Sequence, residues 1–158
     1  MSNNKEKTLV LLKPDALQRN FLGQIITRFE NKGLKIVGLK MIQLEDVVLE
    51  DHYSHIKDKP FFADLRKYMQ SAPVIGMVLE GLEAVKVVRT MAGPTSGREA
   101  PAGTIRGDFS LSLQSNVIHA SDSLEAAEKE VWRFFNNDEV FDYKKLDYEI
   151  VYASDERE

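Results

Sequence analysis

The chain has 158 residues, a formal net charge of −4 and no cysteine, and 43% of its residues are hydrophobic. This length fits a single domain over 1–158, and the hydrophobic content excludes a disordered chain. The acidic balance disfavours non-specific binding to nucleic acid, and the absence of cysteine excludes a disulfide framework and a thiolate metal site.

The first predicted elements follow from the spacing of apolar residues. The apolar run TLVLL at residues 8–12 predicts a short buried strand. Helical spacing over 23–33 predicts a helix with Gly33 as its C-terminal cap, and alternation over 34–44 indicates a second strand.

The middle of the chain predicts a helical pair, a strand and a helix. Residues 48–71 read as two short helices broken at Pro60, and residues 73–81 as a third strand. The pattern over 82–93 predicts a helix that Gly93 caps. The first six residues and about 153–158 are expected to be flexible.

The last third contains a loop, a strand and a helix. Residues 94–107 are rich in Gly, Pro, Ser and Thr, which predicts a long loop, and loops of this length in a compact domain are usually functional or disordered. Residues 116–120 predict the fourth strand. Asp122 and Glu125 form a predicted capping box that opens a helix within 123–135.

This order predicts an α+β fold of ferredoxin-like βαββαβ type. It would have a four-stranded antiparallel sheet with helices packed on one face, plus an added helical pair and a long loop. Many unrelated functions share such a fold, so the activity must be argued from individual residues.

His119 lies where a predicted strand gives way to a predicted helix. Ala120 leaves room beside the imidazole, and the free N–H groups of the helix favour a nearby anion. Glu130 on that helix could bind one ring nitrogen, fix the tautomer and leave the other nitrogen as a nucleophile. A structural histidine at a strand end is the alternative. The placement predicts a histidine that can carry a phosphoryl group.

Side chains would have to bind the phosphates, because the sequence has neither a GxxxxGK[ST] loop nor protein-kinase motifs. Lys13, Arg89, Thr95 and Arg106 are candidates, since arginine offers paired donors and lysine a point charge. Each alone could be a solvated surface residue, but together they lie near strand ends and in one loop.

Two further motifs leave alternatives open. In KDKPFF, one of Phe61 and Phe62 is expected in the core, and an exposed ring could stack on any nucleobase. His52 and His55 have the H-x-x-H spacing of some metal sites. No third ligand is obvious, so a solvated helix face is expected there.

Five segments resemble nucleoside diphosphate kinases in the same order: NVIHASDS, TIRGDF, LLKPDAL, HY..IKDKPFF and EKE. The likeness runs from about residue 7 to about residue 152. It implies a ping-pong phosphotransferase in which a nucleoside triphosphate, typically ATP, gives its γ-phosphoryl group to His119, and a nucleoside diphosphate then collects it. Base specificity would be broad.

The resemblance also implies roles for individual residues. The attacking atom would be Nδ1 of His119, with Glu130 on the other nitrogen and Tyr53 and Ser121 lining the pocket. The nucleotide would be held by Lys13 at the ribose hydroxyl and phosphates, Asn116 at the ribose, Arg89, Thr95 and Arg106 at the phosphates, and Phe61, Leu113 and Leu65 around the base. Mg²⁺ would arrive with the nucleotide, bridging its phosphates, rather than at a metal site of the protein.

The resemblance and the sequence also suggest how the protein assembles and where it is located. The family forms hexamers or tetramers, but Gly97 stands where relatives often have a proline in the loop that helps build the hexamer. Ala16 and Ala120 replace family glycines, and the C-terminus does not match the usual ending.

The N-terminus MSNNKEK lacks the apolar core of a signal peptide, and no apolar run approaches the roughly 20 residues of a membrane span. These features predict a soluble, cytoplasmic protein.

Two other function classes compete with this reading. A regulatory module could keep the nucleotide pocket and have weak or no turnover, although His119, Lys13, Arg106 and Glu130 are all intact. A nucleic-acid binder is disfavoured by the acidic balance and the lack of a basic stripe.

Overall fold

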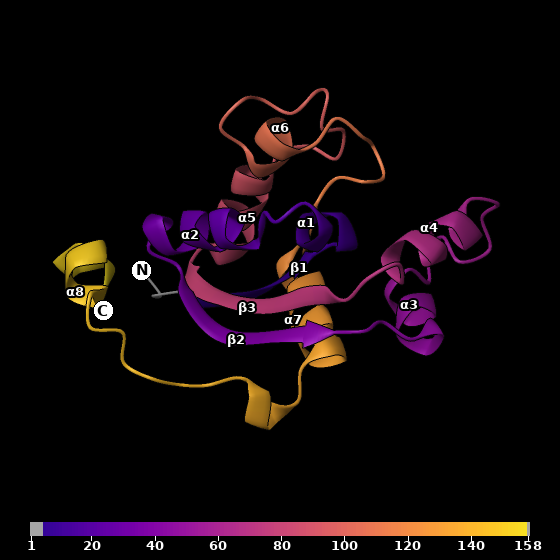
Figure 1. Cartoon of the computed structure of the whole chain (residues 1–158). Coiled ribbons are helices and arrows are strands. Elements are labelled where there is room, and N and C mark those ends of the chain that lie inside the picture. Colours follow the sequence, from indigo (N-terminus) through magenta and orange to yellow (C-terminus); the bar gives the residue numbers. More distant parts are fainter. Residues whose placement is uncertain (1–4, 158) are drawn as a thin grey trace.

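The computed structural model describes residues 5–157 and has a single four-stranded sheet at its centre (Figure 1). The strands are β1 (Lys5–Leu12), β2 (Lys35–Ile42), β3 (Val74–Leu82) and β4 (Ile118–Ala120). Their order in the sheet is β2-β3-β1-β4, and every neighbouring pair is antiparallel. This arrangement confirms the predicted ferredoxin-like α+β fold.

The predicted helices are present with outer ends that differ by one or two residues, but α3 ends at His52, well before the predicted break at Pro60. The helices are α1 (Pro14–Gln18), α2 (Leu22–Lys32), α3 (Asp46–His52), α4 (Phe62–Met69), α5 (Ala84–Ala92), α6 (Ile105–Phe109), α7 (Leu124–Phe134) and α8 (Tyr148–Val151), with 3₁₀ turns η1 (Asn137–Glu139) and η2 (Ser154–Glu156). Gly33 ends α2 in the left-handed conformation, as expected, and Pro60 falls between α3 and α4.

Helices cover both faces of the sheet, so the expectation that they pack on one face is wrong (Figure 1). In β1, Val10 and Leu12 join a core with α2 and α5, whereas Leu9 and Leu11 join a core with α3, α4 and α7. A strand that is buried on both sides needs an unbroken apolar run, which explains the TLVLL segment.

Three short helices, α1, α6 and α8, lie where the sequence predicts none, because four or five residues give too brief a periodic signal. Pro14 ends β1 and also occupies the first turn of α1, where its fixed φ is favourable. The predicted loop 94–107 ends earlier than expected, because Thr104 caps α6 by accepting a hydrogen bond from the Gly107 N–H. In the part of the chain that the structure describes, no helix is both long and apolar enough to cross a bilayer.

The region around β4 also differs from the prediction. The strand begins at Ile118 rather than 116, because Val117 has a positive φ of 61° that interrupts the extended backbone. The predicted capping box of Asp122 and Glu125 is wrong by one residue. Ser123 is the N-cap of α7, and its side chain accepts from the Ala126 N–H.

The first strand starts earlier than predicted, and the chain after α7 packs beside the sheet. Lys5 and Glu6 pair with Leu82 and Gly81 in the sheet, while residues 1–4 and 158 lie outside the described residues. After α7, the chain runs along the outer side of β2 (Figure 1), where the Phe141 N–H donates to the Val37 carbonyl at 2.7 Å. Part of the sheet edge is therefore covered by the chain itself.

Gly97 is buried in the loop between α5 and α6 and leaves no space for a side chain. A Cβ there would lie 2.5 Å from Ser110 Oγ and closer still to the Ser110 carbonyl oxygen. Its N–H also donates to the Ser112 carbonyl at 3.2 Å, a bond that proline could not make. Backbone contact with the 110–112 segment explains why glycine stands at this position.

Replacing Gly97 by alanine should lower the free energy of unfolding by about 2–4 kcal/mol, because the Ser110 backbone must move. Urea denaturation checks this result. The matched control is Gly23→Ala in α2, where nothing lies within 4 Å of a Cβ. That change should be neutral or stabilising by up to about 1 kcal/mol. Equal midpoints for the two variants would contradict the steric explanation.

Candidate active site

His119 is at the centre of the shortest strand, with its side chain 22% exposed. It pairs with Leu11 of β1, and its neighbours Ile118 and Ala120 are buried in the opposite core layer. Alternation along the strand therefore directs the imidazole away from those residues. The Val117 carbonyl accepts from the Lys13 N–H at 2.9 Å, which ties the start of this strand to the end of β1.

Glu130 of α7 holds one nitrogen of the His119 ring. Its Oε2 lies 2.9 Å from Nε2 and also accepts from Ser121 Oγ at 2.5 Å. Because a carboxylate accepts, the ring proton sits on Nε2 and the lone pair on Nδ1. No group among residues 5–157 makes a hydrogen bond to that Nδ1, so a nucleophilic nitrogen is left free.

The charge of Glu130 is secured by its partners. Burial alone would raise its pKa, but the hydrogen bond and charge of His119, together with the Ser121 hydroxyl, lower the pKa to about 2. The carboxylate therefore stays ionised at neutral pH. It can stabilise positive charge that develops on the His119 ring.

Three cations gather next to β4. Arg106 is buried and donates to the carbonyls of Ile118 at 2.6 Å and Gly93 at 2.8 Å, while Arg89 reaches the Ala120 carbonyl at 3.3 Å. Burial and then the charge of Arg89 lower the pKa of Arg106 to about 10.

Lys13 is the third cation, and it is also buried. Its Nζ donates to Asn116 Oδ1 at 2.6 Å, and the Asn116 amide donates to the Thr95 carbonyl at 2.9 Å. Burial and then the charge of Arg106 lower the Lys13 pKa to about 8. Within the described residues, none of the three cations has a carboxylate ion-pair partner, so the cluster suits a bound anion.

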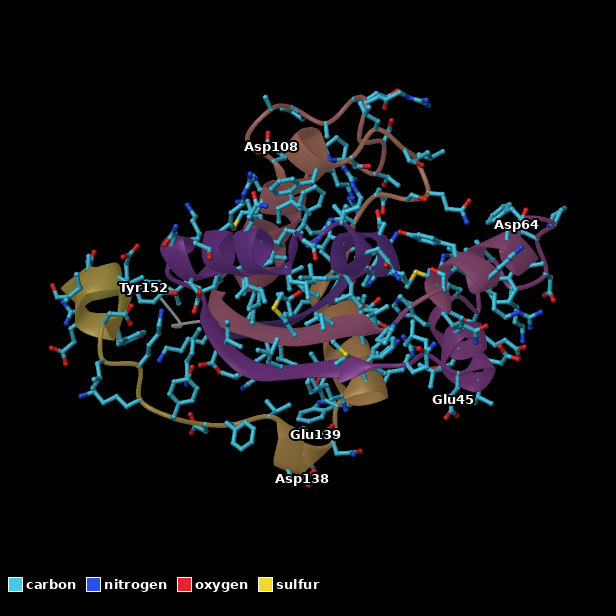
Figure 2. The ribbon with its side chains drawn as sticks, viewed as in Figure 1. Glu45, Asp64, Asp108, Asp138, Glu139 and Tyr152 are labelled. Atoms are coloured by element: carbon cyan, nitrogen blue, oxygen red, sulfur yellow. The ribbon has the colours of Figure 1, made fainter. Side chains whose placement is uncertain are left out.

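The residues expected around a base differ in exposure. Phe61 at the start of α4 is 51% exposed and Leu113 59%, whereas Leu65 and Phe62 are buried. One phenylalanine of KDKPFF thus enters the core and the other remains accessible, as predicted. Acidic side chains such as Glu45, Asp64 and Asp138 lie at the periphery of the molecule (Figure 2).

Tyr53 is the residue that follows α3, and its ring packs against the ring of His52. Its ring lies 4.7 Å from that of His52, measured between centroids. Burial, followed by the charge of Glu130, raises the pKa of Tyr53 to about 12, so its hydroxyl stays protonated. It can therefore act as a hydrogen-bond donor near the histidine.

His52 is the site residue that the sequence reasoning missed. The expectation of a solvated helix face is wrong for it, because its side chain is only 2% exposed, whereas His55 is exposed. A usable signal was present, since Leu49 and His52 are three residues apart and both face the core.

The H-x-x-H pair does not form a shared site. Instead, ligand atoms of His52, His119 and Glu130 lie within 4.8 Å of one another. Arg133 donates to His52 Nδ1, and Glu130 Oε2 accepts from both His119 and Ser121. These potential metal-ligand atoms therefore already have hydrogen-bond partners inside the protein.

Comparison with known proteins gives a consistent picture. The family model described as nucleoside diphosphate kinase matches residues 6–140. The chain is 54% identical to a nucleoside diphosphate kinase of Parabacteroides distasonis, covering 96% of this chain and 99% of that protein. It is 55% identical to one from Staphylothermus marinus, covering 89% and 99%.

Solved structures agree with this result. The structure of a halophilic nucleoside diphosphate kinase from Halobacterium salinarum in complex with CDP has a TM-score of 0.91 and 42% identity, covering 94% of this chain and 99% of that one. A Babesia bovis family protein has a TM-score of 0.90 and 40% identity, covering 93% and 99%. On its sequence and its fold, this chain belongs to the nucleoside diphosphate kinase family.

Proposed function

We infer that the chain works as a nucleoside diphosphate kinase, a phosphotransferase, and we propose that His119 carries the phosphoryl group. The observation that carries the proposal is the free Nδ1 of His119. It sits on a ring held by Glu130, beside three cations that lack an ion-pair partner in the described part of the chain.

The chemistry is a two-step exchange. The Nδ1 lone pair attacks the γ-phosphorus, an N–P bond forms, and the bond to the β–γ bridging oxygen breaks, releasing the nucleoside diphosphate. A terminal β-phosphate oxygen of the acceptor then attacks phosphorus, and the N–P bond breaks. The phosphorylated ring is cationic, and the Glu130 carboxylate stabilises it from 2.9 Å.

The cations supply most of the remaining catalysis. Phosphoryl transfer depends on alignment and on neutralising the phosphate oxygens, which Lys13, Arg89 and Arg106 can do, with Thr95 adding a hydroxyl. We propose that Tyr53 and Ser121 complete the histidine pocket, with Ser121 holding Glu130.

The nucleoside would bind beyond the phosphates. Asn116 and Lys13 would contact the ribose, and Phe61 would stack on the base with Leu113 opposite and Leu65 beneath. A stacking contact has no hydrogen-bond readout, which supports broad base specificity. The CDP complex of the Halobacterium relative is consistent with a base site in this fold.

The site residues fit a metal that arrives with the nucleotide. The cluster around β4 is cationic, and the Glu130 carboxylate is engaged by His119 and Ser121. Mg²⁺ prefers several oxygen ligands, which the phosphates of the nucleotide supply. Lys13, Arg89 and Arg106 would then bind the phosphate oxygens that the metal leaves free.

We also propose a homo-oligomer, either a hexamer or a tetramer. Large apolar side chains are exposed on the outer strand and on the C-terminal segment: Leu39, Met41, Phe141, Leu146 and Ile150. Exposed apolar side chains of this size favour association with another copy of the chain. Sedimentation of the purified protein distinguishes monomer, tetramer and hexamer.

Transfer from labelled ATP to GDP tests the proposed function. ATP alone should leave a label on the protein that is labile in acid and stable in base, and GDP should then remove it as GTP. Nucleotide binding without label or transfer would favour a regulatory module instead. DNA binding that resists salt, without turnover, would favour a nucleic-acid binder.

The lowered pKa of Lys13 predicts an alkaline limit to activity. The lysine is charged below about pH 8 and neutral above it, so its attraction for phosphate is lost as the pH rises. With CDP as acceptor, kcat/KM should decrease above about pH 8, and the decrease should approach tenfold for each pH unit. Lys13→Arg should move this decline to higher pH, because guanidinium stays charged. The control is Lys86→Arg, because Lys86 is exposed and the change should leave the pH profile as in the wild type. If kcat/KM of the wild type stayed constant up to pH 10, Lys13 would not be the group that limits activity.

A further inference from the structure

His52 is a buried histidine that the phosphoryl-transfer steps do not use. It ends α3, and its ring packs edge-on against three aromatic rings: centroid distances are 4.6 Å to His119, 4.7 Å to Tyr53 and 5.1 Å to Phe134. It lies directly behind the proposed nucleophile. Its Nε2 is buried and has no hydrogen-bond partner among the described residues.

The tautomer of His52 follows from its partner. Arg133 Nη1 lies 3.3 Å from His52 Nδ1, and an arginine can only donate, so Nδ1 accepts and the proton is on Nε2. The guanidinium is anchored on its other side by the Asp51 carboxylate. Charged and titratable groups face this ring from α7 (Glu130 and Arg133), from β4 (His119) and from the end of β1 (Lys13).

The ring of His52 stays uncharged. Burial is the main reason, and the charges of His119, Arg133 and Lys13 add to it, outweighing Glu130 and lowering the pKa to about 3. A neutral ring in this position adds no positive charge beside the His119 nitrogen that must attack. It also keeps a lone pair available for Arg133 at working pH.

The geometry around Glu130 indicates what this lone pair does. His52 Nδ1 lies 3.9 Å from Glu130 Oε1, so the Arg133 guanidinium and the carboxylate approach the same nitrogen. Without that acceptor, the Arg133 Nη1–H would be free to bind Glu130, because a guanidinium–carboxylate pair is strong. Glu130 would then hold His119 Nε2 less firmly, and the ring proton could move to Nδ1.

We propose that His52 is a positioning residue for phosphoryl transfer: its Nδ1 engages Arg133 and thereby leaves Glu130 to hold His119 in the tautomer that attacks. The proposal rests on the proposed function. It assigns the role to the acceptor nitrogen of His52 and not to the volume of its ring.

Two substitutions separate the nitrogen from the ring. His52→Phe keeps an aromatic ring and removes the acceptor, whereas His52→Asn loses the ring but keeps an oxygen near the position of Nδ1. His55→Phe is the matched control, because His55 is exposed three residues away. Phosphorylation of the protein by ATP is followed in single turnover, with the thermal midpoint and the ¹⁵N spectrum of labelled histidine. Only three histidines are present, which makes assignment simple.

The expected order of activity is opposite to the expected order of stability. His52→Phe should phosphorylate about tenfold more slowly with little change in KM, as expected when a partner orienting a functional histidine is lost. Its His119 signals should change from one tautomer to a mixture. His52→Asn should be the less stable variant but should recover most of the rate and the single tautomer.

Three results would overturn the inference. The first is a normal rate and a single His119 tautomer in His52→Phe. The second is a rate that follows the thermal midpoint, with His52→Asn slower than His52→Phe. The third is His52 titrating between pH 5 and 8 in the wild-type protein. If the wild type and His55→Phe are themselves never phosphorylated, it is the proposed function that fails.

Discussion

Replacing His119 by alanine should abolish the phosphoprotein and lower transfer from ATP to GDP by on the order of 10⁴-fold or more, because no other group can form the N–P bond. The free Nδ1 is the reason for this expectation, since Glu130 already occupies the other nitrogen at 2.9 Å. Labelling with γ-³²P-ATP, followed by acid and base treatment, measures the loss directly.

The fold of His119→Ala should survive. The side chain is 22% exposed, and Glu130 keeps the Ser121 hydroxyl as a partner. The free energy of unfolding should fall by about 1–3 kcal/mol, the usual effect of removing one partner of a charged hydrogen bond. His55→Ala is the control and should label normally. A label that persists on His119→Ala would remove His119 from its assigned role.

Arg106→Ala should reduce both activity and stability. The side chain donates to two carbonyls, those of Gly93 and Ile118, and both would lose a partner in a buried region. The expected loss is about 2–4 kcal/mol in the free energy of unfolding. Transfer should fall by about 10²–10³ in kcat/KM, because a cation that stabilises phosphate charge is gone.

Two further variants separate these effects. Arg106→Lys keeps the charge but cannot reach both carbonyls, so more of the activity than of the stability should return. Arg98→Ala, in the loop that precedes α6 and exposed, should leave both quantities unchanged. Normal transfer by Arg106→Ala together with a lowered unfolding midpoint would make Arg106 a purely structural residue.

Some features of the protein could be predicted from the sequence because they depend on neighbours along the chain. The apolar run of β1, the helical spacing of α2 and its glycine cap are local patterns, and the structure confirms them. The position of His119 in a short strand shortly before a helix is local as well. The five family segments are also continuous in sequence, which is why the family could be recognised before any fold was known.

Other features could not be predicted, because weak local signals or distant contacts decide them. The α1 and α6 helices are only five residues long, and a single left-handed residue, Val117, sets where β4 begins. Helices on both sheet faces follow from packing, since the pattern of β1 shows that both faces are buried but not what covers each one.

The sequence by itself determined the order of elements, the family and the chemical types of the site residues. Only the tertiary structure decided which polar side chains meet: Lys13 and Asn116 are 103 positions apart, and His52 and Arg133 are 81 apart. Hydrogen bonds and desolvation act over a few ångströms in space, whatever the separation along the chain. A buried, uncharged His52 behind the nucleophile is therefore a property of the folded protein.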